Sequence, residues 1–461
     1  MKIKNRLEYL ASLALFAFLS VSHLSNAAEN NDPAQSLLVR GEWVAKAADC
    51  AACHKGSGPG SSDFSGGKAI ATPMGDIIAT NITPSEQYGI GRYTEAQFKQ
   101  ALTQGIRADG SHLYPAMPYT AYQGMSDADI HALWLWINTS VPAVDKATPQ
   151  TALSFPWSMR SLMGVWNMFN NTPPQPAVPL ETAELQRGYY LTEVLGHCSA
   201  CHSPRNMMLG ESSTHRFSGG EQNGWHAPNI TSDPISGIGG WSDQQLVQYL
   251  KTGNTPGKGV AAGGMGEAVE NSLSHLSDDD LHAIVAWLRQ IPAVRDSAET
   301  QAAWKHPDAP RGSVNETAGK ALYESACAAC HRAGGEGAYG NRFPSLTHNA
   351  TTGSLNPSNL VMVVLDGIHR QGDFVATSMP AFRETLDDKQ IADVTNYITA
   401  QFGNADTRVS PEFVAQQRQG GERPLSVTLL NLAPWLLLAI VVILFAVWFL
   451  RRKNARHHSR G

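Results

Sequence analysis

The sequence has few cysteines, few charged residues and no excess of positive charge. Six cysteines among 461 residues are too few for a small domain held together by disulfides. Charged residues form only 16% of the chain and hydrophobic residues 42%, which excludes a disordered protein. The length favours two or three globular domains.

The formal net charge of −5 is unevenly distributed. Residues 1–8 contribute +2 and residues 451–461 contribute +5, so the segment between them carries −12. An acidic body of this kind repels phosphate backbones, which excludes nucleic acid as a partner.

The N-terminus has the pattern of an export signal. An apolar run over residues 10–21 follows a basic start, and Ser25-Asn26-Ala27 supplies the small residues that a signal peptidase requires. A buried N-terminal helix is the alternative, but polar residues 29–32 follow directly. Residues 1–27 are therefore predicted to be a cleaved signal peptide of an exported protein.

The C-terminus has the pattern of a membrane anchor. Residues 432–450 contain no charge over 19 positions, with Trp435 and Trp448 near the two ends. Arg451, Arg452 and Lys453 follow, and the positive-inside rule places them in the cytoplasm. We therefore expect a single transmembrane helix in the bacterial inner membrane, a basic cytoplasmic tail over 451–461 and a periplasmic body.

All six cysteines fall into three copies of the motif Cys-x-x-Cys-His. On a helix the two thiols share one face and the histidine continues it, so two thioether bonds can hold a haem edge while the imidazole reaches the iron. The alternatives are thiol redox and zinc sites, which need a βαβ context or cysteine pairs brought together from different motifs. The motifs predict three covalent haem c groups at Cys50, Cys53, His54, Cys198, Cys201, His202, Cys327, Cys330 and His331.

The similarity between the motif regions extends beyond the cysteines. The repeated segments are Arg-Gly at 40–41 and 187–188, Phe-Ser-Gly-Gly at 64–67 and 217–220, and Asn-Ile-Thr at 81–83 and 229–231. The third region is shorter and carries Phe-Pro-Ser-Leu at 343–346. We expect an all-α protein with three tandem cytochrome c domains over residues 35–145, 181–292 and 315–404.

Each predicted domain ends with two helices. The first begins at a capping residue and ends at a glycine, and the second begins at another capping residue. The residues are Thr94, Ser242 and Asn356-Pro357 for the first caps, Gly105, Gly253 and Gly367 for the glycines, and Ser126, Ser277 and Asp387 for the second caps. Nothing in the pattern predicts a sheet.

A methionine on the loop between these two helices is the candidate sixth iron ligand. Met117 and Met265 each lie 63 residues after the histidine of their motif. Met379 lies 48 residues after His331 and is followed by proline, as Met117 is. The competing ligands are histidines that do not recur at equivalent spacing: His112, His215, His226, His275, His282, His348 and His369. Histidine–methionine ligation closes the iron and favours one-electron transfer over substrate activation.

The connecting segments differ in character. The linker over 146–180 contains an apolar helix face, and its stripe residues are Phe155, Met159, Leu162, Trp166 and Phe169. This face is expected to dock on the body, a partner subunit or the membrane interface. Residues 293–314 form a second linker, and the polar residues 405–431 are expected to tether the body to the anchor.

Taken together, the three motifs, the repeated segments, the linker over 154–169 and the Met-Pro loops resemble the triple-haem cytochrome c subunits of bacterial membrane-bound dehydrogenases. That group serves alcohol, gluconate, sorbitol, fructose and aldehyde oxidation, and the likeness covers about residues 35–405. The resemblance implies a non-catalytic subunit that receives electrons from a flavin-, quinone-cofactor- or molybdenum-containing catalytic subunit and delivers them to ubiquinone. It also implies His54, His202 and His331 as axial ligands with Met117, Met265 and Met379.

A second function stays open from the sequence. A free-standing membrane-anchored cytochrome c could link soluble donors to a terminal oxidase, because an acidic body can dock a basic partner.

Overall fold

The computed structural model describes residues 33–56, 62–308, 318–339, 342–371 and 377–458. The predicted signal peptide over 1–27 lies outside the described residues. So do residues 309–317, where the second linker meets the third predicted domain.

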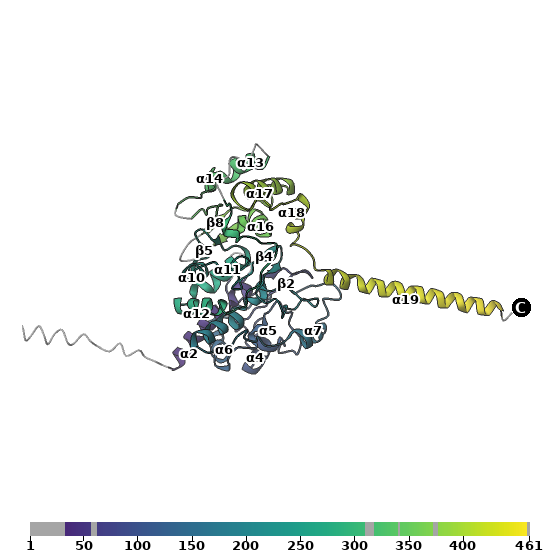
Figure 1. The fold of residues 1–461 in the computed structure, drawn as a ribbon. Coiled ribbons are helices and arrows are strands. Elements are labelled where there is room, and N and C mark those ends of the chain that lie inside the picture. Colours follow the sequence, from purple (N-terminus) through teal and green to yellow (C-terminus); the bar gives the residue numbers. More distant parts are fainter. Residues whose placement is uncertain (1–32, 57–61, 309–317, 340–341, 372–376, 459–461) are drawn as a thin grey trace, which may run out of the picture.

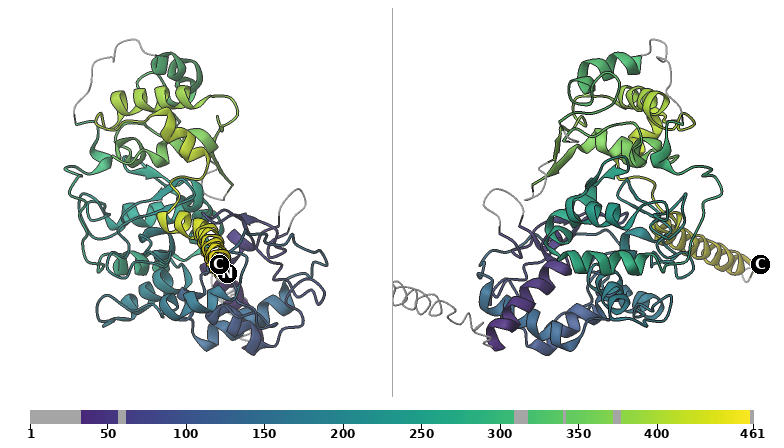
Figure 2. Two further views of the ribbon diagram at one scale, coloured as in Figure 1. Left: turned by 90° about the vertical axis from the view of Figure 1, so that its right-hand side faces the viewer. Right: turned by 60° about the vertical axis from the view of Figure 1, so that its left-hand side comes forward.

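The described chain is mostly helical (Figures 1 and 2). We group its helices into three units, one around each Cys-x-x-Cys-His motif. The first unit and the linker contain α2 (Pro33–Ala47), α3 (Cys50–His54), α4 (Glu95–Gln104), α5 (Tyr119–Tyr122), α6 (Asp127–Ser140) and α7 (Leu162–Asn170). The second unit contains α8 (Ala183–Tyr189), the π-helix η1 (Tyr190–Leu195), α9 (Ser199–His202), α10 (Asp243–Thr252), α11 (Gly263–Asn271), η2 (Leu273–His275) and α12 (Asp278–Leu288), followed by η3 (Ala303–Lys305). The third unit contains α13 (Ala318–Leu322), the π-helix η4 (Tyr323–Cys327), α14 (Ala328–His331), α15 (Ala350–Gly353), α16 (Ser358–Asp366) and α17 (Asp388–Phe402), before α18 (Pro411–Arg418) and α19 (Leu425–His458).

In the part of the chain that the structure describes, four short antiparallel strand pairs correct the expectation that no sheet is present. The pairs are β1 (Ala69–Ile70) with β2 (Ile77–Ile78), β3 (Gly220–Gln222) with β4 (Trp225–Ala227), β5 (Asn254–Thr255) with β6 (Gly259–Val260), and β7 (Ile368–Arg370) with β8 (Thr377–Met379). Strands of two or three residues are too short to show the alternating hydrophobic pattern by which strands are predicted.

In each unit the first helix crosses the last helix at a glycine. A Cβ atom on Gly41, Gly188 or Gly319 would lie 2.2, 2.0 or 2.1 Å from a backbone oxygen of α6, α12 or α17 respectively. Any larger residue would push the two helices apart. The glycine of the repeated Arg-Gly segment is therefore required by close helix packing.

The arginine of the same segment has a different role. Arg40 Nε lies 2.5 Å from Asp129 Oδ1, and Arg187 Nε lies 2.7 Å from Asp280 Oδ1. Both aspartates are in the first turn of the last helix of their unit. The third unit has Ala318 before its glycine and cannot form this ion pair.

The predicted helix caps are largely confirmed. Thr94 and Ser242 form capping boxes with Gln97 and Gln245, and the side chains of Ser126, Ser277 and Asp387 accept the expected backbone hydrogen bonds. In the third unit, Pro357 directly precedes α16 and has no side-chain acceptor, but the predicted Asn356 accepts from the Ser358 amide through its Oδ1 at 2.9 Å. Gly105 and Gly253 end their helices in the left-handed conformation, and Gly367 also has a positive φ.

The first and second units share one hydrophobic core. Val44, Ile130 and Leu133 of the first unit belong to the same buried cluster as Leu191 and Trp287 of the second. Two further clusters lie in the third unit and α18, one around Val361 and Ile391 and one around Tyr323 and Phe402. Asn359 of the third unit hydrogen-bonds to the backbone of His226 in the second unit. Its Oδ1 accepts from the His226 amide at 2.9 Å, and its Nδ2 donates to the His226 carbonyl at 2.8 Å.

The residues between the third unit and the anchor are structured, unlike the predicted tether. Val414 of α18 is fully buried, and Arg418 bonds to Asp388 at 2.5 Å. The helix α19 then leaves the body (Figure 1). Within the described residues, the stretch Leu425–Arg451 of this helix is long and apolar enough to cross a membrane.

Candidate functional site

Each Cys-x-x-Cys-His motif ends in a short helix, α3, α9 or α14, that follows the first helix of its unit. All six cysteines lie within the described residues, and none of them forms a disulfide bond. The two thiols of a motif therefore remain available for bonds to another group.

The three motif histidines are oriented in the same way. The Nδ1 atom of His54 lies 2.7 Å from the Thr80 carbonyl oxygen, that of His202 lies 2.7 Å from the Pro228 carbonyl, and that of His331 lies 3.0 Å from the Pro344 carbonyl. A carbonyl only accepts, so the proton of each neutral ring must be on Nδ1. The lone pair of each Nε2 is then free to bind a metal, which is the usual arrangement of a metal-bound histidine.

The Asn-Ile-Thr segment holds the carbonyl that orients the histidine. Asn81 follows Thr80 directly, and its Oδ1 accepts from the Thr83 amide at 2.9 Å and the Thr83 hydroxyl at 2.7 Å. Its Nδ2 donates to the Val144 carbonyl at 2.8 Å. Asn81 is buried, so these bonds fix the turn that presents Thr80 to His54.

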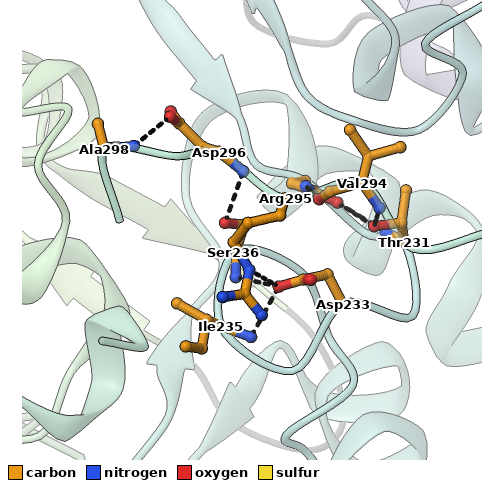
Figure 3. Close-up of polar contacts among 9 residues, drawn as sticks. Thr231, Asp233, Ile235, Ser236, Val294, Arg295, Asp296 and Ala298 are labelled. Carbon is orange, nitrogen blue, oxygen red and sulfur yellow. Dashed lines mark hydrogen bonds and ion pairs between the residues drawn. The ribbon is translucent and has the colours of Figure 1, made fainter. Parts of the chain in front are cut away.

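The second unit repeats this turn, with added contacts. Asn229 makes the same two bonds to Thr231 and donates to the Val294 carbonyl at 2.7 Å. Figure 3 shows the adjoining loop, where Asp233 accepts from Arg295 at 2.7 Å. The recurrence of Asn-Ile-Thr is thus explained by its position beside the histidine. The third unit uses Pro344 of its Phe-Pro-Ser-Leu segment instead.

The Phe-Ser-Gly-Gly segment packs against the same turn. The amides of Gly66 and Gly219 donate to the carbonyls of His54 and His202, both at 2.8 Å. A Cβ atom on Gly66 would lie 2.4 Å from the Thr80 carbonyl carbon, and the φ of this residue is +68°. Glycine is therefore needed beside the turn that orients His54.

A cavity of about 1760 Å³ connects the first and second motifs. It is lined by Cys50, Cys53, His54 and Met117 of the first unit and also by Cys201 of the second. Small-molecule sites usually measure about 300–1,000 Å³, so this cavity has room for a large group or for two. The prediction that groups His54 with Met117 is consistent with this arrangement.

A smaller cavity lies in the third unit. Cys327, His331 and Met379 line it together with apolar side chains such as Leu346 and Ile398. Met379 is the last residue of β8, where a loop was predicted.

Met265 is placed differently from the other two methionines. It lies inside α11, although the sequence predicted a loop, and neither Met265 nor His202 lines either of the two cavities. The first turn of α11 is Gly263-Gly264-Met265-Gly266, whereas Met117 precedes a proline.

Of the seven competing histidines, all of which lie within the described residues, His226 lines the larger cavity. Its Nδ1 lies 2.7 Å from Glu221 Oε1, so one ring nitrogen is already hydrogen-bonded to a carboxylate. His197, which the sequence did not single out, also lines this cavity, and its ring contacts that of Tyr122 at 5.7 Å between centroids. The hydroxyl of Tyr122 donates to the Ala48 carbonyl, so this contact links the two motif regions.

The family of this chain follows from its similarity to known proteins. A family model described as cytochrome c matches residues 38–140 and 316–401. The chain is 43% identical over 447 residues to the fructose dehydrogenase cytochrome subunit of Gluconobacter japonicus, covering 91% of this chain and 92% of that protein. The chain belongs to the family of dehydrogenase cytochrome c subunits. The predicted resemblance is confirmed.

Two further relatives belong to the same family. The alcohol dehydrogenase (quinone) cytochrome c subunit of Komagataeibacter europaeus is 36% identical over 417 residues, covering 87% of each chain. The gluconate 2-dehydrogenase cytochrome c subunit of Pantoea cypripedii is 38% identical over 431 residues, covering 87% of this chain and 94% of that protein.

Membership of this family implies covalently bound haem c, and the protonation states of the motif residues fit such a group. Burial lowers the pKa of the His54 and His331 rings and lowers that of His202 to about 4, so each ring is neutral, as a metal ligand must be. Burial raises the pKa of the Cys50 and Cys198 thiols to about 12, with smaller effects of neighbouring acidic groups and thiols.

The buried thiols do not have the environment of a thiol-redox site. Reactive redox cysteines have a lowered pKa, whereas burial raises the pKa of the Cys50 and Cys198 thiols. Within the described residues, no group of three or more His, Cys, Asp or Glu side chains is arranged to hold a metal ion. The cytochrome c family therefore favours haem over the alternative sites, and attachment through these particular cysteines stays a prediction.

Proposed function

We propose that this chain is the electron-transfer subunit of a membrane-bound dehydrogenase and carries three covalent haem c groups. The main support for this proposal is one local geometry that occurs three times: the Nδ1–H of a motif histidine donates to a backbone carbonyl. One such site in each unit would hold one iron through Nε2.

The remaining contacts would come from the other predicted residues. The thiols of Cys50, Cys53, Cys198, Cys201, Cys327 and Cys330 would form the thioether bonds, and Met117, Met265 and Met379 would be the sixth ligands. Haem held by these residues would supply reversible one-electron chemistry. The chain orients the imidazoles through the backbone carbonyls of Thr80, Pro228 and Pro344 and fixes the spacing of the sites.

The proposed electron donor is a catalytic subunit that oxidises CH–OH or aldehyde groups, with flavin, a quinone cofactor or molybdenum. The relatives whose names mention fructose, alcohol and gluconate dehydrogenases support this donor class. The proposed acceptor is ubiquinone. Support comes from the larger cavity, which is lined by His54 and also by Gly421, Pro424 and Ser426, next to or within the start of α19.

The proposed location is the periplasmic face of the bacterial inner membrane. The apolar stretch of α19, the basic residues that follow it and the predicted signal peptide over 1–27 all support this orientation.

Haem content tests the proposal directly. Mass spectrometry of the mature chain is expected to show three haem increments on one polypeptide. A mature, coloured chain with fewer increments, or with free thiols that still react, would contradict three attachment sites.

Ligand assignment is tested by potentiometry. Met117→Leu is expected to lower the reduction potential of one haem, because a methionine axial ligand raises the potential, and to leave the other two unchanged. Met168→Leu, an exposed methionine on α7, is the matched control and should change none. A loss of potential at two haems would contradict the assignment of Met117 to one site.

The partner is tested by affinity purification of the full chain in mild detergent. A catalytic dehydrogenase subunit should co-elute in fixed ratio, and the purified chain alone should not oxidise an alcohol or sugar acid. Isolation of the chain without a partner, but with rapid reduction by a soluble donor, would favour a free-standing cytochrome instead.

A further inference from the structure

The linker between the first and second units presents a row of large apolar side chains to the outside. Its exposed residues are Phe155, Met159, Leu162, Val165, Met168 and Phe169, and the last two are 80% and 66% exposed. Singly exposed apolar residues are ordinary, but a contiguous group on one short segment marks an interaction surface. We call these six residues the linker face.

The opposite side of the same segment is fixed to the body. Met163 is buried, the Tyr119 hydroxyl donates to Asn167 Oδ1 at 2.8 Å, and the Trp166 indole donates to the Met208 carbonyl at 2.8 Å. The linker face is therefore held outward by contacts on its other side, and packing against its own body does not cover it.

The linker lies beside the start of the anchor helix. The Trp157 indole nitrogen donates to Asn431 Oδ1 at 2.7 Å. Asn431 lies near the N-terminal end of the apolar stretch Leu425–Arg451 and directly before the predicted span 432–450, so this bond places the linker beside the end of the anchor that is nearer the body. Figure 1 shows α7 on the side of the body from which α19 leaves.

The charge of the linker also fits a lipid surface. Arg160 is the one charged residue between Ala147 and Leu180, in a chain with 40 acidic residues. Its guanidinium is directed to the body, where Nη1 donates to the His112 carbonyl at 2.9 Å and the group stacks 4.4 Å from the centre of the Tyr114 ring. The linker face thus carries no charge that would need water, and no acidic group that anionic lipids would repel.

We propose that the linker face is a second membrane contact, embedded among the lipid headgroups beside α19. Leu162, Val165, Met168 and Phe169 are exposed apolar residues of the short helix α7, which lies beside the end of α19 nearer the body. An exposed apolar side of this kind is a feature of a helix that lies in the plane of the membrane interface. The inference rests on the proposed role of α19 as a membrane anchor.

The test uses single introduced cysteines in the full chain. Because the six native cysteines would be held in thioether bonds, an introduced cysteine is the reactive thiol that accepts a fluorescent label. Val165→Cys on α7 and Val39→Cys on α2 are a matched pair, since these valines are 52% and 59% exposed. Leu444→Cys in the middle of α19 reports on the anchor itself.

The labelled proteins are placed in nanodiscs of phosphatidylcholine and phosphatidylglycerol, with and without lipids that carry a nitroxide quencher near the headgroup. The Val165 label should be quenched by the lipid nitroxide, and its iodide quenching constant should be about threefold or more below that of the Val39 label. The Leu444 label should be inaccessible to iodide.

The outcomes separate the inference from the proposed function. If the Leu444 label is shielded while iodide quenches Val165 and Val39 equally, the linker face is not a membrane contact, although the anchor stands. If iodide also quenches the Leu444 label, both proposals fail. If the Val165 label becomes shielded only after the catalytic subunit is added, the face is a protein interface and the membrane contact is overturned.

Discussion

At the scale of single residues, the site depends on an asparagine in each of the first two units, buried at position 81 and half-buried at position 229. The Cys-x-x-Cys-His motifs could be predicted from sequence because their residues are contiguous. The carbonyl partner of each histidine could not, since it is a backbone atom 26 residues away in the first two units and 13 in the third. The recurrence of Asn-Ile-Thr was the available signal, but sequence alone did not show what the asparagine bonds.

Replacing that asparagine should weaken the fold at the histidine. Asn229→Ala removes two acceptor bonds and one donor bond, and is expected to lower the free energy of unfolding by about 2–3 kcal/mol. Asn229→Asp keeps the acceptor oxygen and loses the donated bond to Val294, so its effect should be smaller. Guanidinium unfolding measures both variants. Equal losses would show that the acceptor bonds do not stabilise the turn.

A buried carboxylate in η1 should make stability depend on pH. Burial raises the pKa of Glu193 to about 7 from an ordinary 4.5, and the opposing effect of its ion pair with Arg216 is smaller. Between pH 4.5 and 7 the folded state holds a proton that the unfolded state releases, so stability falls as the pH rises through this window.

The corresponding measurement compares thermal unfolding of Glu193→Gln with the wild type. Relative to the wild type, the variant should gain stability between pH 4.5 and 7, by at most about 3 kcal/mol. Glu42→Gln, at an exposed ion pair with Lys46, is the control and should show a nearly constant difference. A constant difference for Glu193→Gln as well would mean that Glu193 titrates normally.

At the scale of elements, the helix caps were predictable because a cap is a local pattern of three or four residues. The strand pairs were not, and neither was the position of Met265 inside α11, because short elements follow the packing around them more than their own pattern. In the sequence, the close helix crossings left only one signal, the recurring glycines. The helices that these glycines contact lie about 90 residues further along the chain in the first two units, so the sequence did not identify them.

Substitution at one crossing should separate the two helices. In Gly188→Ala the new Cβ would lie 2.0 Å from the Ala283 carbonyl oxygen, and about 1–3 kcal/mol of stability is expected to be lost. Gly264→Ala, whose Cβ would have nothing within 4 Å, should be neutral or slightly stabilising in helix α11. Thermal unfolding distinguishes them. Similar melting temperatures for both variants would contradict the close crossing.

At the scale of the whole molecule, the joint core of the first two units could not be predicted from repeats, which indicate similar domains but not how they pack. The residues around Val44 and Trp287 form one cluster, whereas the third unit keeps its own clusters and meets the second partly through polar contacts such as that of Arg370 with Thr252.

Unfolding is therefore expected in two steps. Gly41→Ala and Gly188→Ala should lower the temperature of the same calorimetric transition, because both lie in helices of the joint core. Gly319→Ala should lower the other transition and leave the first in place. Three separate transitions, each sensitive to one variant, would show that the first two units are energetically independent.

The joint core also limits how genes of this kind can be rearranged. Recombination between the first two modules would leave half of an apolar surface facing water, and the product would be expected to aggregate. The third module keeps its own interior, so it is the part that could be gained, lost or exchanged during evolution without unfolding what remains.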